Sequence, residues 1–235
     1  MKDARRERVL KLASAAAFLA IVAVAVLIVV SQSQSEGGDA GNIQGAAEVD
    51  ALLRGISQDG LELGRPGAPV TLVEFGDLQC TGCKAASEDL LPQLIEGPVR
   101  RGEARIDFRN FAIIGAESVP AGAAAIAAGA QGRGWNFVEL FYRNQGEEDS
   151  GYVTDEFLTA LARRAGVHEV ARWNRERKRK PVLAEVEETS AEAKELGFAG
   201  TPSFAVEGPA TSGLEPLGLP SSAGDLETAI TATHE

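Results

Sequence analysis

Cys80 and Cys83 are the only cysteines in this chain of 235 residues, and they lie at a predicted junction between a strand and a helix. The preceding apolar segment, residues 70–75, is short and rich in β-branched side chains, as is typical of a buried parallel strand. The residues from Cys80 to about Ile95 are predicted to form a helix, with a kink at Pro92. A Cys-x-x-Cys segment at this junction puts both sulfurs on one helical face, the first at the helix N-terminus, where free N–H groups favour a thiolate. The pattern therefore predicts thiol-disulfide exchange.

Two other uses of the cysteine pair are less favoured. A structural zinc site needs four ligands, and besides the cysteines the chain offers only His168 and His234, both far away in sequence. A purely structural disulfide would stabilise the fold little, because a loop closed over two residues removes little entropy from the unfolded chain. We therefore expect no metal and no cofactor at Cys80 and Cys83.

An apolar segment near the N-terminus predicts a membrane anchor. Residues 12–30 contain no charge and a single hydroxyl, that of Ser14, and roughly 20 such residues span the hydrocarbon core of a bilayer. Basic side chains are concentrated in residues 1–11, so the positive-inside bias places this segment in the cytoplasm and the C-terminal domain outside the cytoplasm. A cleaved signal peptide is the alternative, but its apolar region usually has roughly 7–15 residues and an A-x-A-like site soon after it. We expect an uncleaved, single-pass anchor in the cell membrane.

The distribution of charge agrees with this division of the chain. The first 30 residues have a net charge of +3, and the remaining 205 residues have a net charge of −14. Such an acidic domain is not expected to bind nucleic acid. A basic run at residues 172–180 departs from the acidic average and is a candidate surface for an anionic partner or lipid headgroups, although charge runs on helices are usually solvated faces.

Apolar periodicity predicts the order of the remaining elements. Residues 31–59 are expected to form a flexible tether followed by a short helix. A second strand is expected at 104–114, where Ile106 and Phe108 alternate with charged residues, and strand, helix and strand in this order predict a right-handed parallel unit. Helices are predicted at 121–131, 135–142, 154–165 and 181–196, followed by a strand at 203–206 and a helix at 223–233.

Several segments together resemble one known family. A Cys-x-x-Cys pair after a strand is a weak signal alone, but here a distant Gly200-Thr201-Pro202 segment precedes another strand. The chain resembles the membrane-anchored, DsbA-like branch of the thioredoxin superfamily in its opening strand, its helical insertion and its cis-proline segment, at residues 63–80, 123–131, 135–145 and 195–204. The resemblance implies an α/β thioredoxin fold over residues 60–235, with a helical insertion at about 115–197 between the two halves of the core. One transmembrane helix would precede this domain.

The resemblance also implies roles for single residues. Cys80 would be the exposed reactive cysteine and Cys83 the more buried resolving thiol. Pro202 would follow a cis peptide bond, placing the backbone of Thr201 beside the disulfide, where an extended substrate strand can pair with it. The alternative for Pro202 is an ordinary turn proline in the trans form.

Glu74 is an acid within an otherwise apolar strand. The resemblance places it where family members bury a carboxylate beneath the active-site helix, and such a group would have a raised pKa and could relay the proton of Cys83. The alternative is an acid at a strand end that reaches solvent or a salt bridge. Asp77 is closer to the cysteines, and we interpret it as a structural loop residue.

The two residues between the cysteines depart from the family pattern. Many relatives carry Pro after the first cysteine, and strongly oxidising members carry Pro-His, whereas this chain has Thr81 and Gly82. No imidazole is present there to stabilise a Cys80 thiolate, and Gly82 loosens the turn. The redox potential therefore cannot be transferred from the strongest oxidant of the family.

These features predict an exported, membrane-tethered enzyme that exchanges disulfides with cysteine-containing exported clients, and disulfide formation is the favoured direction. A membrane redox partner would re-oxidise or re-reduce the cysteine pair. A reductase or isomerase of the same fold is the main alternative, followed by a non-catalytic binding module on a thioredoxin scaffold. A copper-delivering relative is disfavoured, because soft-metal sites use His or Met and Met1 is the only methionine.

Overall fold

The computed structural model describes residues 42–218 and 220–234. The predicted basic segment at 1–11, the transmembrane segment at 12–30 and most of the expected tether lie outside the described residues. Within the two described ranges, no helix is both long and apolar enough to cross a membrane.

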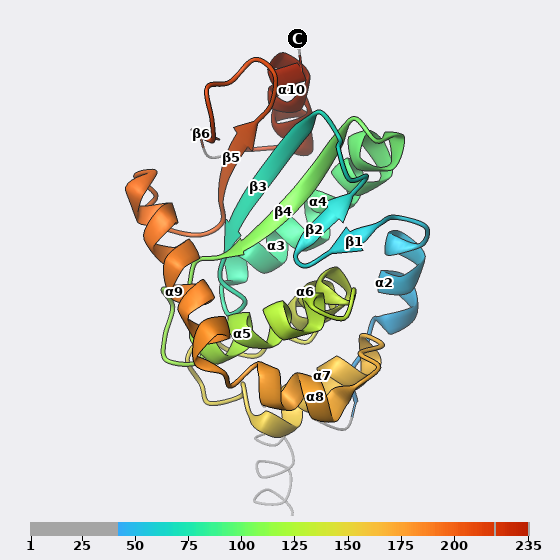
Figure 1. The fold of residues 1–235 in the computed structure, drawn as a ribbon, viewed down its shortest axis with the longest axis vertical. Helices are drawn as coiled ribbons and strands as arrows, with labels where there is room; N and C mark the ends of the chain where they lie inside the picture. Colours follow the sequence, from blue (N-terminus) through green and yellow to red (C-terminus); the bar gives the residue numbers. More distant parts are fainter. Residues whose placement is uncertain (1–41, 219, 235) are drawn as a thin grey trace, which may run out of the picture. The chain divides into compact units, whose positions relative to one another are not determined.

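The described residues form a six-stranded sheet with the order β1-β2-β4-β3-β5-β6 (Figure 1). β3 and β4 are parallel, whereas β2 pairs with β4 and β5 pairs with β3 in antiparallel fashion. The parallel pair is the strand, helix and strand unit predicted from the sequence. The strands are β1 (Gln58–Asp59), β2 (Glu62–Gly64), β3 (Val70–Gly76), β4 (Ala104–Asn110), β5 (Ser203–Glu207) and β6 (Glu215–Pro216).

Helices connect and cover these strands. α3 (Thr81–Asp89), α4 (Leu91–Leu94) and the π-helical η1 (Ile95–Val99) join β3 to β4. A set of five helices stands between β4 and β5 as the predicted helical insertion, and it gathers near the ends of β3 and β4 (Figure 1). The insertion comprises α5 (Ser118–Gly129), α6 (Gly134–Arg143), α7 (Asp155–Arg164), α8 (Val170–Glu176) and α9 (Lys180–Glu195). α2 (Ala46–Leu53) precedes the sheet, and α10 (Ala223–His234) follows it.

Both faces of the sheet are covered, and β3 is buried along its whole length. Leu72 belongs to the main core together with residues of α3 and α4. Val73 belongs instead to a smaller cluster on the opposite face, which includes Ala193 of α9. Because successive side chains of a strand alternate between the two faces, Glu74 lies on the same face as Leu72. β3 thus places an acid in the core, on the face that packs against α3 and α4.

The helix after the cysteines is divided, whereas one continuous helix with a kink was predicted. α3 and α4 are separated at Leu90, and Pro92 lies in the first turn of α4, where its missing N–H leaves no helical hydrogen bond unmade. The helical path then continues through η1 to Val99, beyond the predicted end at Ile95.

Two differences surround β4. The strand ends at Asn110 and not at Ile114, because the N–H groups of Ile113 and Ile114 donate to the side chain of Asp77 (2.8 and 2.9 Å). The short strands β1 and β2 were not predicted, and β1 lies within the segment expected to be a tether and short helix. Strands of two and three residues carry too little periodicity to be read from sequence.

Small residues let α5 pack closely against its neighbours. α5 consists mainly of Ala and Gly, and most of its residues are buried. The indole N–H of Trp173 in α8 donates to the carbonyl of Ala124 in α5 (2.9 Å). A side chain at Gly129 would collide with the turn between β1 and β2, since a Cβ there would lie 2.6 Å from the carbonyl oxygen of Gly60.

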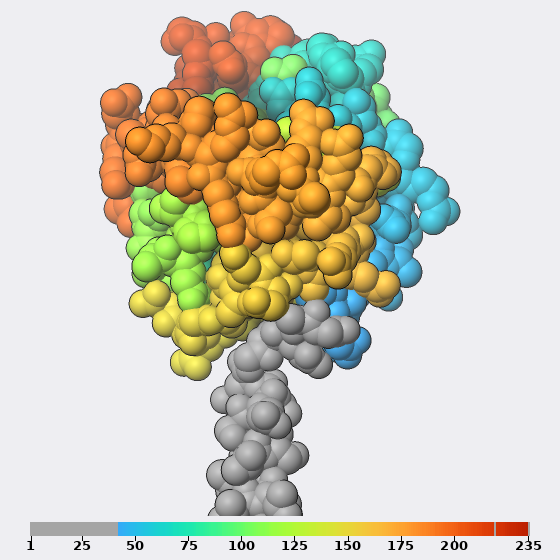
Figure 2. Space-filling view, turned by 60° about the horizontal axis from the view of Figure 1, so that its bottom comes forward, coloured from blue at the N-terminus to red at the C-terminus, as the bar shows by residue number. Residues whose placement is uncertain are grey.

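The basic run at 172–180 lies on α8 and the start of α9, which form part of the orange surface in Figure 2. Arg177 is only 4% exposed, and it stacks on the Trp173 ring at 5.0 Å from its centroid. Its guanidinium donates to Asp155 (2.6 Å), and Lys178 pairs with the same carboxylate. These contacts tie α7 to α8, which favours a structural role for the run over a site for an anionic partner.

Candidate active site

Cys80 and Cys83 lie at the N-terminus of α3, as predicted. Cys80 is the N-cap residue, with an extended backbone (φ −70°, ψ 123°), and Cys83 lies in the first turn. Both are free thiols; Cys80 is 6% exposed and Cys83 is fully buried. Cys80 therefore lies at the end of the helix, where the backbone N–H groups of Gly82 and Cys83 donate hydrogen bonds to its sulfur. Cys80 is thus the more accessible of the two cysteines, but it is buried and not exposed as the resemblance implied, because it lies against the Thr201 carbonyl.

The surroundings shift the two thiols in opposite directions. A hydrogen bond from the Cys83 thiol is the largest cause that lowers the pKa of Cys80, from 9.0 to about 6, against the opposing effect of burial. The Thr201 side chain and the N–H groups of Cys83 and Gly82 lower it further. Burial raises the pKa of Cys83 well above 9.0, and its bond to Cys80 and the charge of Glu74 add to this. At neutral pH, Cys80 is therefore the thiolate and Cys83 the thiol.

The Thr201-Pro202 segment lies beside Cys80. The peptide bond between these two residues is cis, as predicted. When Cys80 is protonated, its thiol donates to the carbonyl of Thr201 (3.3 Å). The Thr201 hydroxyl is buried, and the Thr201 side chain is one of the causes that lower the pKa of Cys80. This buried hydroxyl is therefore a neutral group that favours the Cys80 thiolate.

Glu74 is fully buried, and neither carboxylate oxygen has a hydrogen-bond partner within the described part of the chain. The alternative of an acid that reaches solvent or a salt bridge is therefore wrong. Burial is the main cause that raises the pKa of Glu74 from 4.5 to about 8, and the charges of Glu139 and Cys80 add to it. The charge of Glu74 in turn raises the pKa of Cys83. A largely protonated acid therefore lies near the buried thiol at neutral pH.

A second buried acid, Glu139 of α6, lies near the site and was not predicted from the sequence. Its carboxylate is fully buried, accepts a hydrogen bond from Ser87 of α3 (3.0 Å) and pairs with Arg143. Burial raises the pKa of Glu139, against the opposing effect of Arg143. The sequence lacks a signal for this group, because the residue lies far along the chain and only the tertiary packing of α6 against α3 brings it to the site.

Asp77 is a structural residue, as we interpreted it from the sequence. Its side chain is 2% exposed and accepts backbone N–H groups from Gln79, Ile113 and Ile114. The side chain of Gln79 also connects the two loops, because its amide donates to the Ser118 hydroxyl (2.9 Å). These bonds hold the loop after β4 against the loop that carries Cys80. The two histidines, by contrast, are exposed and far from the cysteines in sequence.

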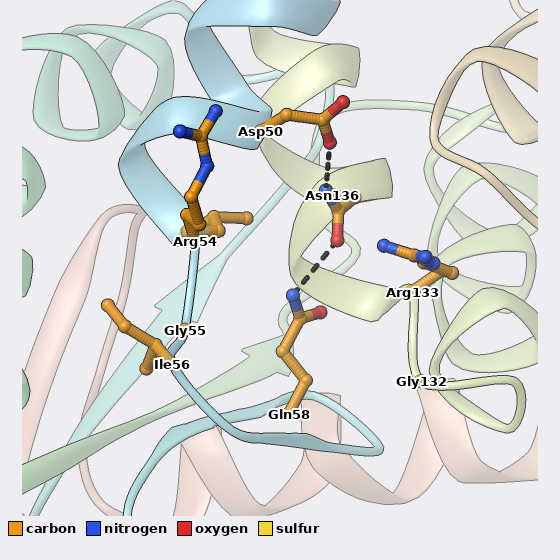
Figure 3. A pocket seen from close by; sticks show the side chains of 9 residues that line it. Asp50, Arg54, Gly55, Ile56, Gln58, Gly132, Arg133 and Asn136 are labelled. Carbon is orange, nitrogen blue, oxygen red and sulfur yellow. Dashed lines mark hydrogen bonds between the residues drawn. The ribbon is translucent and has the colours of Figure 1, made fainter.

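A polar hollow of about 500 Å³ lies elsewhere, between α2, β1 and the start of α6. In Figure 3 the amide of Asn136 lies between Asp50 and Gln58, accepting from Gln58 (2.9 Å) and donating to Asp50 (3.1 Å). Arg54 and Arg133 line the same hollow, and the cysteines do not. The polar groups in its wall serve to attach α2 and β1 to α6.

Comparisons with known proteins agree with this geometry. A family model described as Thioredoxin matches residues 57–217, which include the cysteines and the cis-proline segment. The chain belongs to this thioredoxin family. The predicted thioredoxin-like α/β fold with a helical insertion is confirmed.

Relatives place this thioredoxin-family chain among disulfide oxidoreductases. The probable disulfide bond formation protein D of Bacillus cereus is 30% identical over 149 residues, which cover 62% of this chain and 69% of the relative. The oxidised crystal structure of BdbD from Bacillus subtilis has a TM-score of 0.64 at 22% identity, covering 75% of this chain and 96% of that chain. A thioredoxin-like oxidoreductase from Silicibacter pomeroyi has a TM-score of 0.58 at 27% identity, covering 77% and 95%. The protein is a DsbA-like thiol-disulfide oxidoreductase.

Proposed function

We propose that the protein forms disulfide bonds in exported cysteine-containing proteins while tethered to the outer side of the cell membrane. The observation that favours oxidation of the client over its reduction is the contrast between the two thiols. The pKa of Cys80 is lowered to about 6, whereas that of Cys83 is raised. A stabilised Cys80 thiolate favours the dithiol form of the enzyme over its disulfide form. An enzyme with this preference passes its disulfide to clients.

The exchange then proceeds in two balanced steps. A client thiolate attacks Sγ of Cys80 in the enzyme disulfide, so that a mixed disulfide forms and Cys83 leaves as a thiolate. The second client thiolate attacks the client sulfur of the mixed disulfide, and Cys80 leaves. Two electrons pass from the client to the enzyme, and the low pKa of Cys80 makes it the better leaving group. A membrane redox partner must then remove these electrons.

Glu74 and the cis-proline segment have supporting roles in this proposal. The Cys83 thiolate that leaves in the first step is buried and strongly basic, and protonated Glu74 is the acid that supplies its proton. The Thr201 backbone next to Cys80 is where an extended client segment pairs with the enzyme. Both roles rest on the positions of these groups around the two sulfurs.

The enzyme activity is tested with a reduced, unfolded client that has two cysteines. We expect the disulfide form of the enzyme to oxidise this client and Cys80→Ser to abolish the reaction. Cys83→Ser cannot form the enzyme disulfide and should also fail to oxidise the client. When this variant is given the client in its disulfide form, the Cys80 thiolate should attack that disulfide and remain trapped as a mixed disulfide, because no second enzyme thiol resolves it. If the wild-type enzyme left the client reduced and instead reduced a disulfide such as that of insulin, the reductase alternative would replace the proposal.

Export and tethering are tested separately by protease treatment. The basic residues 1–11 and the apolar segment 12–30 support an N-terminus in the cytoplasm and a domain outside it. Protease added to cells stripped of their outer layers should digest the domain and spare the N-terminal segment. A domain that is digested only after the membrane is lysed would contradict the proposed location.

A further inference from the structure

The connection between α6 and α7 is attached to the loop that carries the cysteines. The side-chain amide of Gln145 donates to the carbonyls of Leu78 (2.8 Å) and Cys80 (3.1 Å). The backbone N–H of Asp149 donates to the side chain of Gln79 (3.0 Å). These bonds fix the position of the intervening residues next to the reactive cysteine.

Glu148 of this connection occupies the N-terminus of the active-site helix. Its Oε1 accepts the backbone N–H of Thr81 (2.9 Å), the first residue of α3, and the Thr81 hydroxyl (3.1 Å). The Cys80 sulfur accepts hydrogen bonds from the next two N–H groups, those of Gly82 and Cys83. A carboxylate and a thiolate therefore share the free N–H groups of one helix end.

Two anions at one helix end oppose each other. A helix N-terminus stabilises a nearby negative charge, but a carboxylate that already uses the first N–H group leaves less of this stabilisation for a second anion and repels it. We propose that Glu148 is a positioning residue that restrains Cys80, by occupying the first N–H group of α3 and adding a competing negative charge at the same helix end. The enzyme is consequently a weaker oxidant than its cysteine motif would otherwise allow.

Other charged and titratable groups near Cys80 stay in place in the variants below. They include Cys83 and Lys84 in α3, Glu74 in β3 and Tyr142 in α6, the last of which has a raised pKa because of burial. Asp149, in the same connection as Glu148, is also unchanged, and its backbone N–H donates to Gln79. Glu148 differs from them because it contacts the helix end directly. Glu147, its neighbour, is exposed and serves as a matched control of equal charge.

The experiment compares Glu148→Gln, Glu148→Ala and Glu147→Gln in the complete protein. Glutamine keeps an oxygen that can accept both bonds from Thr81 but removes the charge, whereas alanine removes both. Two quantities are measured: the pH dependence of Cys80 alkylation, and the equilibrium with the glutathione couple. For Glu148→Gln we expect alkylation to begin at lower pH and the equilibrium to shift about two- to fivefold toward the dithiol form, the range for a single charge at a helix end. Glu148→Ala should shift both in the same direction, and Glu147→Gln should leave both unchanged.

Each other outcome overturns the proposal. If Glu147→Gln shifts the equilibrium as much as Glu148→Gln, the effect belongs to the general negative field of the domain. If Glu148→Gln behaves as wild type while Glu148→Ala only lowers the unfolding midpoint, Glu148 is a structural cap with no influence on Cys80. Urea unfolding of all variants shows whether the fold is retained, and Glu148→Gln preserves the cap if Glu148→Ala does not fold.

Discussion

At the scale of single residues, Glu74 is a buried acid whose negative charge nothing in its described surroundings stabilises. It is fully buried without a hydrogen-bond partner among the described residues, and its pKa is raised to about 8. Burying an ionised carboxylate in apolar surroundings is unfavourable, so the group holds a proton in the folded protein at pH values where it has lost it in the unfolded chain. A group of this kind lowers the free energy of unfolding as the pH rises.

Glu74→Gln should remove this dependence. The folded protein binds the extra proton between about pH 4.5 and 8, so the free energy of unfolding of the parent protein falls with rising pH in this window relative to the variant. We expect the variant to be more stable at pH 8 to 9 by an amount on the order of a few kcal/mol, and equally stable near pH 4. Urea unfolding at a series of pH values measures the difference.

The control must exclude the two thiols, because the lowered pKa of Cys80 gives a pH dependence of opposite sign. Both proteins are therefore compared in a Cys80→Ser, Cys83→Ser background. Glu147→Gln, which removes an exposed acid, should leave the curve unchanged. Two parallel curves for the parent and Glu74→Gln would show that Glu74 ionises in the folded protein as it does in the unfolded chain.

The site residues that could be predicted from the sequence are those that stand in a recognisable motif next to a strand. Cys80 and Cys83 are three residues apart after a strand, and Thr201-Pro202 precedes another strand, so the motif and its context suffice. Glu139 and Glu148 could not be found in this way. Each is an ordinary acid in the sequence and becomes part of the site only because α6 and the following connection pack against α3.

At the scale of elements, the position of the insertion depends on close contacts between backbones. α5 ends beside the turn between β1 and β2, where Gly129 lies against Gly60. The indole N–H of Trp135 in α6 donates to the carbonyl of Leu61 in the same turn (2.7 Å). The four helices that the sequence predicts for the insertion are present in the structure. The turn between β1 and β2, against which α5 and α6 pack, was not predicted, because β1 and β2 are too short to be recognised from periodicity.

Gly129→Ala should loosen this contact. A Cβ at this position would lie 2.6 Å from the carbonyl oxygen of Gly60, and backbone cannot yield as a flexible side chain does. We expect the free energy of unfolding to fall by about 1–3 kcal/mol, the usual cost of overpacking, as measured by urea unfolding. Gly218→Ala is the matched control, since a Cβ at that glycine meets no atom of the described residues within 4 Å. Equal stability of the two variants would show that α5 can move away from the turn without cost.

At the scale of the whole molecule, the reduction potential combines all these contributions. The dithiol form is stabilised by whatever lowers the Cys80 pKa, here the Cys83 thiol, the Thr201 hydroxyl and two backbone N–H groups. Glu148 acts in the opposite direction in our proposal, and Thr81 and Gly82 supply no cation. Every group that favours the Cys80 thiolate is neutral. We therefore expect the dithiol form to be stabilised less than in a family member whose thiolate is paired with a cation.

We accordingly expect a reduction potential between those of thioredoxin and the strongest oxidant of the family, which lie at roughly −270 and −120 mV. Each unit by which the Cys80 pKa is lowered stabilises the dithiol form by about 1.4 kcal/mol, or about 30 mV for a two-electron couple. Equilibration with glutathione measures the potential directly. In a thermodynamic cycle, the dithiol and disulfide proteins differ in stability by the difference between the reduction potentials of the folded protein and the unfolded chain. The lowered pKa of Cys80 stabilises the folded dithiol form, so we expect the dithiol protein to unfold at a higher urea concentration than the disulfide protein. A potential at or below that of thioredoxin, with the disulfide form the more stable, would instead identify a reductase that receives electrons from a membrane partner.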